Sequence, residues 1–231
     1  MKFSLVIPCY NESANLPLLL THCMALSALP GFEIILVDNG STDDSPKVLQ
    51  NLLPHYPGIR SIRIEKNRGY GFGILSGLKV AEGKILGWTH ADMQTDPKDV
   101  LLGLHLFETQ GIGLFVKGKR YGRPLMDVLF TVGMSLFETM LLGKPFWDIN
   151  AQPNMFSRSF FESWDDPPND FSLDLYTYYQ AHQKRLKICR FPVLFGKRAH
   201  GVSHWNVNWA AKWKFIRRTV EFSLYLKRKL K

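Results

Sequence analysis

FSLVIPCYNE, residues 3–12, decides the fold of this chain. Its first six residues form a short apolar run that ends at a turn, which is typical of a buried strand. The same pattern returns in EIILVDNGSTDD (residues 33–44) and in KILGWTHADMQTDP (residues 84–97), and a helical pattern follows each of the three. Strands that alternate with helices over short links predict a mostly parallel α/β sheet, of the Rossmann-like class, with helices on both faces.

Further elements extend this pattern. Another strand is expected at SIRIE (61–65), followed by a glycine-rich loop, KNRGYGFG (66–73), which opens a helix over 74–81. LFVKGKRY (114–121) and RLKICRFPV (185–193) read as later strands. The remaining helices are expected over 13–29, 44–53, 96–109, 125–142, 170–183 and from 208 to the end.

Composition limits the classes of protein. The 231 residues are 45% hydrophobic, enough for one packed domain, and we divide the chain into a domain over 1–205 and a basic amphipathic helix over 206–231. Three scattered cysteines suit a reducing compartment, and no uncharged apolar stretch of about 18 residues is present. We therefore expect a cytoplasmic protein, peripheral on the inner face of the membrane, without a membrane-spanning helix.

Polar residues follow three successive strands. They are Tyr10–Glu12, Asp38–Ser41 and His90–Asp92. In such sheets, ligands bind beyond the carboxyl ends of the strands, so these loops are expected to converge at one edge. The segment GYGFG lacks the spacing of a dinucleotide fingerprint and does not follow the first strand, which argues against a dehydrogenase.

Four motifs in this order resemble the family 2 glycosyltransferases of the GT-A fold: SLVIPCYNE, LVDNGSTD, NRGYGFG and THADMQTDP. The later segments VKGKRY, DINAQPNMFSR and FGKRAHGVSHW look most like the dolichyl- and polyprenyl-phosphate sugar synthases. The resemblance covers about Phe3 to His204. Each motif is weak alone, but four in register are a specific signal.

The resemblance implies a pocket for a nucleoside diphosphate sugar. Position by position, it places Pro8, Tyr10 and Glu12 around the base and ribose, with Val37 and Asn39 closing over the base. The family usually has Asp where Asn39 stands, which puts the base preference in doubt. Capping of the following helices is the alternative role for Asn39 and Glu12.

The resemblance also implies a divalent metal, Mg²⁺ or Mn²⁺. The family's Asp-x-Asp motif matches His90–Ala91–Asp92, so the first carboxylate is a histidine, and Gln94 matches a position that touches metal or phosphate. Mg²⁺ and Mn²⁺ take few protein oxygens and the rest from phosphate and water, a pattern that Asp92 and Gln94 suit. His90 is either a nitrogen ligand of the metal or a hydrogen-bond donor to phosphate. Ala91 would lie against the nucleoside diphosphate sugar.

The acceptor question depends on charge. A lipid phosphate is already ionised and needs cations, and Lys119, Arg120 and Arg123 stand in one predicted loop. Arg120 and, in a second loop, Arg198 and His200 match basic positions of the polyprenyl-phosphate family; His204 stands where that family often has Lys. A solvated basic loop is the plain alternative.

A hydroxyl acceptor would instead need a general base. Asp148, Asp170 and Asp174 could supply it, and Asp170 could equally cap the helix that follows. We therefore keep two reactions open, both inverting and metal-dependent. The leading one transfers a hexose to a polyprenyl phosphate, and the alternative transfers a sugar to a hydroxyl of a surface polysaccharide or lipid-linked glycan.

The C-terminal segment carries much of the net charge of +9, with eight Lys or Arg from residue 206 onward against one acid, Glu221. Its apolar stripe and basic face suit a helix lying on an anionic membrane, although packing on the domain or on a second subunit of a homo-oligomer would also explain them. A basic nucleic-acid-binding protein is the hypothesis from another class, but no groove-reading motif is present. The stripe is Trp209, Trp213, Ile216, Val220 and Leu224, beside Lys214, Arg217, Arg218 and Arg228.

Overall fold

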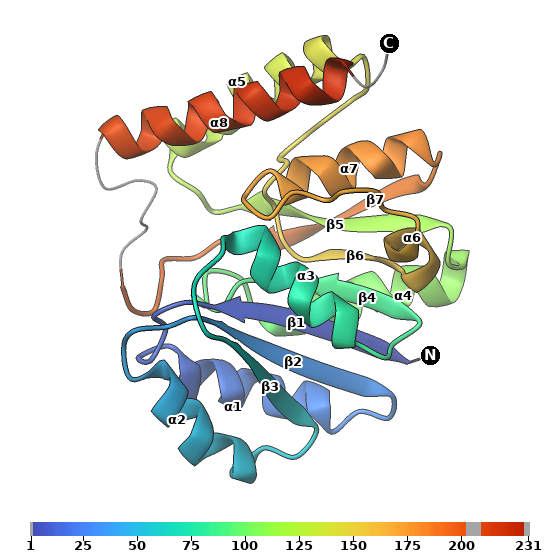
Figure 1. Ribbon diagram of the computed structural model, residues 1–231. Coiled ribbons are helices and arrows are strands. Elements are labelled where there is room, and N and C mark those ends of the chain that lie inside the picture. The colour runs from blue at the N-terminus through green and yellow to red at the C-terminus, as the bar shows by residue number, and fades with distance from the viewer. Residues whose placement is uncertain (1, 202–208, 229–231) are drawn as a thin grey trace.

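The computed structural model describes residues 2–201 and 209–228. One seven-stranded sheet runs through it in the order β3-β2-β1-β4-β6-β5-β7 (Figure 1). All strands are parallel except β6, which runs antiparallel to both of its neighbours. The strands are β1 (Phe3–Cys9), β2 (Phe32–Asn39), β3 (Ile59–Ile64), β4 (Ile85–Trp88), β5 (Leu114–Tyr121), β6 (Asn154–Ser157) and β7 (Lys187–Leu194). The prediction of a mostly parallel α/β sheet is confirmed.

Helices cover both faces of the sheet. α1 (Leu16–Ser27), α2 (Ser45–Leu52) and α4 (Val100–Gln110) pack on one face, while α3 (Tyr70–Val80), α6 (Arg158–Glu162) and α7 (Leu173–Gln183) pack on the other. Short 3-10 turns occupy Leu53–His55 and Pro97–Asp99.

Alternate residues of each central strand point to opposite faces, which is why β1 contributes to both cores. Leu5 and Ile7 lie in the core beneath α1, and Val6 lies in the core beneath α3. Burying such a side chain contributes roughly 1.5–3 kcal/mol, so the apolar run at 3–9 holds the two layers together.

Two differences from the expected elements concern the site. α3 begins at Tyr70, four residues earlier than expected, so Gly71 and Gly73 lie inside the helix rather than in a loop before it. β6 and α6 were not anticipated at all, because NMFS is too short to show a strand period.

α5 (Leu125–Leu142) and α8 (Trp209–Arg228) form a separate pair beside α7, at the end of the molecule away from α1 and α2 (Figure 1). Between them Ser223 Oγ donates a 2.7 Å hydrogen bond to Glu138 Oε1, and both side chains are buried. Burial raises the pKa of Glu138 to about 7. This contact fixes where α8 lies on α5.

The expectation that no helix spans a membrane has to be weighed against α5. Among the described helices it is long and apolar enough to do so by length and composition, with a mean hydropathy of 1.6. Much of its surface is open, and Leu125, Met126 and Met140 are each more than 70% exposed. On α8 the expected apolar stripe is split, because Trp213 and Leu224 are exposed while Ile216 and Val220 are half-buried.

Candidate functional site

The predicted site residues gather at one edge of the sheet. Six parallel strands end there, so the loops after β1, β2, β4, β5 and β7 all open on the same side. Direct hydrogen bonds and ion pairs then tie these loops to one another. The expected convergence is thus what the structure shows.

The loop after β1 is fastened to the loop after β2. Asn11 Oδ1 accepts a 2.8 Å hydrogen bond from the Thr42 amide, and the Asn11 amide donates to Ser41 Oγ at 3.0 Å. Asn11 adopts a φ of 56°, a left-handed conformation that asparagine tolerates better than most residues. This turn leaves the Tyr10 ring partly exposed beside half-buried Pro8.

Asn39 connects the end of β2 to the glycine-rich segment. Its Nδ2 donates a 2.9 Å hydrogen bond to Gly69 O, while its buried Oδ1 has no hydrogen-bond partner among the described residues. Asp38 Oδ1 accepts from the Ser41 amide at 2.9 Å. Neither side chain caps α2. Val37 is fully buried, with its side chain in the core beneath α3 rather than at the surface.

Asp92 lies at the centre of the loop after β4 and is 5% exposed. Arg198, from the loop after β7, places Nη2 2.8 Å from Asp92 Oδ2. Asp92 Oδ1 accepts from the Gln94 amide at 3.1 Å, and Gln94 Nε2 donates to Gly196 O at 3.1 Å. The two predicted residues Asp92 and Arg198 are therefore direct partners, and Gln94 joins their loops.

Glu12 completes this corner. Burial raises the pKa of Glu12; a hydrogen bond from Asn15 opposes the rise, and the nearby Asp92 carboxylate adds to it. Asn15 Nδ2 also donates to His200 O at 3.3 Å, which brings the loop after β7 against the loop after β1. The His200 side chain is exposed, and His204 lies outside the described residues.

His90 lies between Asp92 and a second buried carboxylate, Asp174. Burial lowers the pKa of His90, although both carboxylates act to raise it. A neutral imidazole can offer a lone pair to a cation or one N–H to a phosphate. The Tyr70 ring lies against it, with 5.8 Å between ring centroids, and Ala91 beside it is buried.

The residues at this corner fit a divalent cation whose remaining ligands come from phosphate and water. Among residues 2–201 and 209–228, no three His, Cys, Asp or Glu side chains form a metal-binding group. Asp92 is a buried carboxylate that already faces a cation, the Arg198 guanidinium. Asp92 offers a carboxylate, Gln94 an amide oxygen and His90 a ring nitrogen, which are atom types that a phosphate-bound Mg²⁺ or Mn²⁺ could use.

A second cationic group lies after β5. Arg120 donates from both Nε, at 2.9 Å, and Nη2 to the single oxygen Oδ1 of Asp148, and its guanidinium lies 5.0 Å from the Phe195 ring centre. Arg123 and Arg190 each place a nitrogen 3.7 Å from the same carboxylate. Burial alone would raise the pKa of Asp148, but the arginines outweigh burial and hold that pKa below its usual value. Three guanidinium groups against one carboxylate leave an excess of positive charge.

Sequence reasoning missed a buried polar network beneath His90. Lys117 Nζ donates to Ala151 O at 2.6 Å and to Asn154 Oδ1 at 2.7 Å. Asp174 Oδ1 accepts from Asn154 Nδ2 and from Gln152 Nε2, both at 3.0 Å. Burial lowers the pKa of Lys117 to about 7 and raises the pKa of Asp174. A lysine inside the apolar run LFVKG was the signal that could have revealed it.

The three candidate bases have different surroundings. Asp148 and Asp174 are each 1% exposed and engaged by the partners just described. Asp170 is about one-third exposed; its Oδ1 accepts from the Ser172 amide at 2.9 Å, and its Oδ2 lies 3.1 Å from Arg218 Nε. Asp170 therefore forms a turn before α7, whose N-terminal cap is Ser172.

The segment that carries Asp170 lies on the glycine-rich start of α3. The Phe72 amide donates a 2.9 Å hydrogen bond to Asn169 O. A Cβ on Gly71 would lie 2.5 Å from Pro168 O and 2.7 Å from Asp170 O, so only glycine permits this approach. The contact brings residues 168–170 to the rim of the site.

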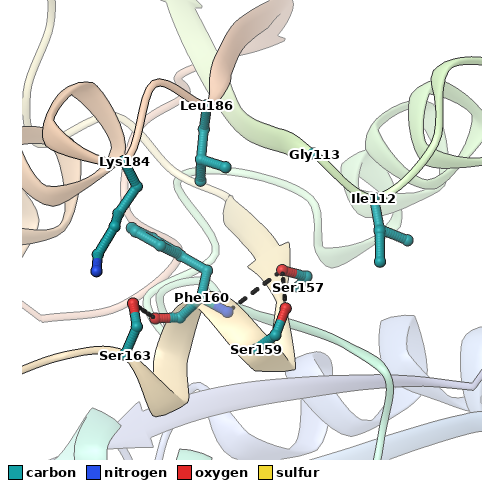
Figure 2. A pocket seen from close by; sticks show the side chains of 8 residues that line it. All are labelled: Ile112, Gly113, Ser157, Ser159, Phe160, Ser163, Lys184 and Leu186. Carbon is teal, nitrogen blue, oxygen red and sulfur yellow. Dashed lines mark hydrogen bonds between the residues drawn. The ribbon is translucent and has the colours of Figure 1, made fainter.

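A shallow depression at the opposite edge of the sheet is a separate feature (Figure 2). Ser157, at the far end of β6, lines it with Ser159 and Ser163. Ser157 Oγ accepts from the Phe160 amide, and Ser163 Oγ donates to Phe160 O, so these hydroxyls bind α6 itself. The predicted residues do not line this depression.

Comparisons with known proteins found a matching family model, curated relatives and solved structures of similar fold. Residues 4–151 match the family model described as "Glycosyl transferase family 2". Two curated relatives are undecaprenyl-phosphate 4-deoxy-4-formamido-L-arabinose transferases. The protein from Enterobacter sp. (strain 638) is 36% identical over 103 residues, and that from Sodalis glossinidius is 37% identical over 105 residues. Each match covers 43% of this chain and 31% of the relative, so the chain matches about a third of those proteins.

Solved structures share the fold. Glucosyl-3-phosphoglycerate synthase from Mycobacterium tuberculosis in complex with UDP aligns with a TM-score of 0.72 at 20% identity, covering 98% of this chain and 80% of that one. A mannosyltransferase from Pyrobaculum calidifontis in complex with GDP-Man and Mn²⁺ aligns with a TM-score of 0.66 at 18% identity, covering 94% and 64%. The fold of this chain is therefore the GT-A fold, as the motifs predicted.

Proposed function

We propose, because this chain belongs to glycosyl transferase family 2, that it transfers a sugar from a nucleoside diphosphate sugar to a polyprenyl phosphate at the cytosolic face of a membrane. The observation that carries the proposal is the joint placement of Asp92 with Arg198 and of Arg120 in a cationic cluster, at one edge of the sheet. The names of the undecaprenyl-phosphate transferases that resemble part of this chain support the choice of acceptor.

The donor would occupy the loops after β1, β2 and β4. Pro8, Tyr10, Glu12 and Asn39 border the expected nucleotide pocket, and the buried Asn39 Oδ1 is an acceptor that a base N–H could use. The diphosphate would face Asp92 and Arg198. A divalent ion held there by Asp92, Gln94 and His90 would stabilise the charge of the leaving diphosphate.

The transfer would be a single displacement with inversion. An acceptor phosphate oxygen forms a bond to the anomeric carbon as the bond from that carbon to the donor diphosphate breaks, and the electron pair leaves with the nucleoside diphosphate. An ionised phosphate needs no general base, which fits the burial of Asp148 and Asp174. Arg198 would hold the donor diphosphate, and Arg120, in its positively charged cluster, would hold the acceptor phosphate.

The second candidate is transfer to a sugar hydroxyl. The exposed part of the Asp170 carboxylate, at the rim of the site, is the observation that favours it, since a hydroxyl acceptor must lose a proton. Undecaprenyl phosphate and an oligosaccharide, offered in parallel with labelled nucleotide sugars and Mn²⁺, separate the two candidates. Product from the lipid phosphate alone is expected, and product from the oligosaccharide alone would reverse the assignment.

Arg120→Met is expected to lower kcat/KM for the lipid phosphate about tenfold or more, because one positive charge of the proposed acceptor site is lost. Two other guanidinium groups remain 3.7 Å from Asp148, so we expect the variant to fold. Lys119→Met is the matched control, since Lys119 is exposed and points to the other face of β5. Equal losses in the two variants would indicate only a solvated basic segment.

We also propose that α5 and α8 lie on an anionic membrane surface. Exposed apolar residues of α5 and the exposed cations Lys227 and Arg228 of α8 belong to the same pair of helices, a combination that suits the interface of such a membrane. These apolar residues are Leu125, Met126, Leu129, Leu136 and Met140. From this surface the protein would reach an acceptor whose long lipid tail lies in the membrane.

Met126→Ser with Leu129→Ser is expected to weaken binding to phosphatidylglycerol vesicles about tenfold or more, because two apolar side chains lose their lipid contact. Met24→Ser with Leu102→Ser is the control, since these apolar residues are about half exposed and lie on α1 and α4 instead of α5. Vesicle co-sedimentation measures both. Unchanged binding of the α5 variant would refute this orientation.

A further inference from the structure

Arg218 joins the C-terminal helix to the rim of the site. Its Nε lies 3.1 Å from Asp170 Oδ2, and its guanidinium lies 5.4 Å from the centre of the Phe171 ring. One side chain therefore makes an ion pair and a cation–π contact with two consecutive residues. Both contacts are to the segment that precedes α7, far from α8 in the sequence.

The residues that Arg218 contacts lead directly to His90. The Phe171 ring stacks on Tyr70 with 4.6 Å between centroids and 9° between planes. Tyr70 in turn lies against the His90 ring, and its hydroxyl accepts a 3.0 Å hydrogen bond from Gln152. Two rings in succession, those of Phe171 and Tyr70, thus connect the guanidinium of α8 with the imidazole beside Asp92.

The position of Arg218 is itself fixed by α5. One and a half turns further along α8, Ser223 donates to the buried Glu138, and Leu226 is buried in the core beneath α7. A shift of α8 along α5 would break these contacts and move Arg218 away from Asp170. The packing of the helix pair is therefore linked mechanically to the rim of the site.

We infer that Arg218 is a positioning residue of the donor site. By holding Asp170 and the Phe171 ring, it keeps Tyr70 stacked beside His90, so the geometry at Asp92 depends on the seating of α8 against α5. This inference rests on the proposed donor site. It assigns to the C-terminal helix a part in the reaction that is separate from any contact with a membrane.

Amide hydrogen exchange in the full chain tests the positioning directly. In Arg218→Ala, the amides of Phe72 and Ser172 are expected to exchange about tenfold faster, because the segment that holds their acceptors loses an ion pair and a cation–π contact. Arg217→Ala is the matched control, since Arg217 is 72% exposed and pairs with Glu221 at 2.8 Å on the outer side of α8. Equal exchange in the two variants would overturn the inference.

Kinetics then separate positioning from folding. With Mn²⁺, Arg218→Ala is expected to lower kcat about tenfold and to leave the dissociation constant of UDP or GDP within about twofold, because the nucleotide pocket lies on other loops. Arg218→Lys, which keeps the charge but loses the planar group, is expected to have a kcat between those of Arg218→Ala and the wild type. An unchanged kcat with normal nucleotide binding would refute this inference alone. Failure of the wild type to bind either nucleotide would remove the proposed donor site itself and, with it, the role of Arg218 there.

Discussion

Asp92→Asn is expected to lower kcat/KM for sugar transfer by about 100-fold or more. The Asp92 carboxylate lies 2.8 Å from the Arg198 guanidinium. It is also the one carboxylate among the three proposed metal ligands, His90, Asp92 and Gln94. An amide of the same shape removes the negative charge that holds both cations against the leaving diphosphate, and losses of this size follow the removal of such groups. Transfer of labelled sugar, measured over a range of Mn²⁺ concentrations, reports the change.

Asp96→Asn is the control for that experiment. Asp96 lies in the same loop, its side chain accepts a hydrogen bond from the Lys98 amide, and asparagine caps a helical turn about as well as aspartate. Its activity is expected to stay within about twofold of the wild type. If Asp92→Asn kept full activity as well, neither a metal nor the diphosphate could be placed at Asp92.

Lys117→Met is expected to reduce the free energy of unfolding by about 3 kcal/mol. Methionine fills much of the volume of lysine, but it leaves Ala151 O and Asn154 Oδ1 without their donor in a fully buried setting. Each buried polar atom that loses its partner costs about 1–3 kcal/mol. Denaturant unfolding followed by circular dichroism measures the loss, and nucleotide binding shows whether the change extends to His90.

Lys119→Met provides the comparison for stability, because an exposed substitution two residues along the same strand should stay within about 0.5 kcal/mol. Adding Asp174→Asn to Lys117→Met is expected to recover part of the loss, since the network then contains neither buried charge. If Lys117→Met were as stable as Lys119→Met, the buried amine would have no role in holding β5, β6 and α7 together.

The sequence predicted the sheet well because its central strands are continuous apolar runs. Val6, Ile35 and Leu86 are fully buried, and such runs between turn-forming residues have few other readings. β6 could not be predicted in the same way. Its four residues become a strand because β4 and β5 present hydrogen-bonding edges on either side, and that pairing arises only in the tertiary structure.

The candidate site, like the sheet, has features that the sequence predicts and features that arise only in the tertiary structure. Parallel strands force their carboxyl ends together, so the meeting of the loops that carry Glu12, Asn39 and Asp92 could be expected from their places after successive strands. The side-chain contacts beneath and around these loops could not be predicted from the sequence. Whether Lys117 points inward, and whether Arg218 of a distant helix reaches Asp170, depends on how side chains face one another across packed layers. No spacing in the sequence encodes that.

The contact at Gly71 has a consequence for anyone who recombines this protein with its relatives. The helix that opens at Tyr70 and the segment 168–170 touch backbone to backbone, with no room for a Cβ between them. The two stretches therefore have to fit each other closely despite about a hundred residues of separation. A chimera whose incoming helix lacks a glycine at position 71 would meet a steric barrier at the mouth of the proposed donor site, and crossover points are better chosen so that both stretches come from the same parent.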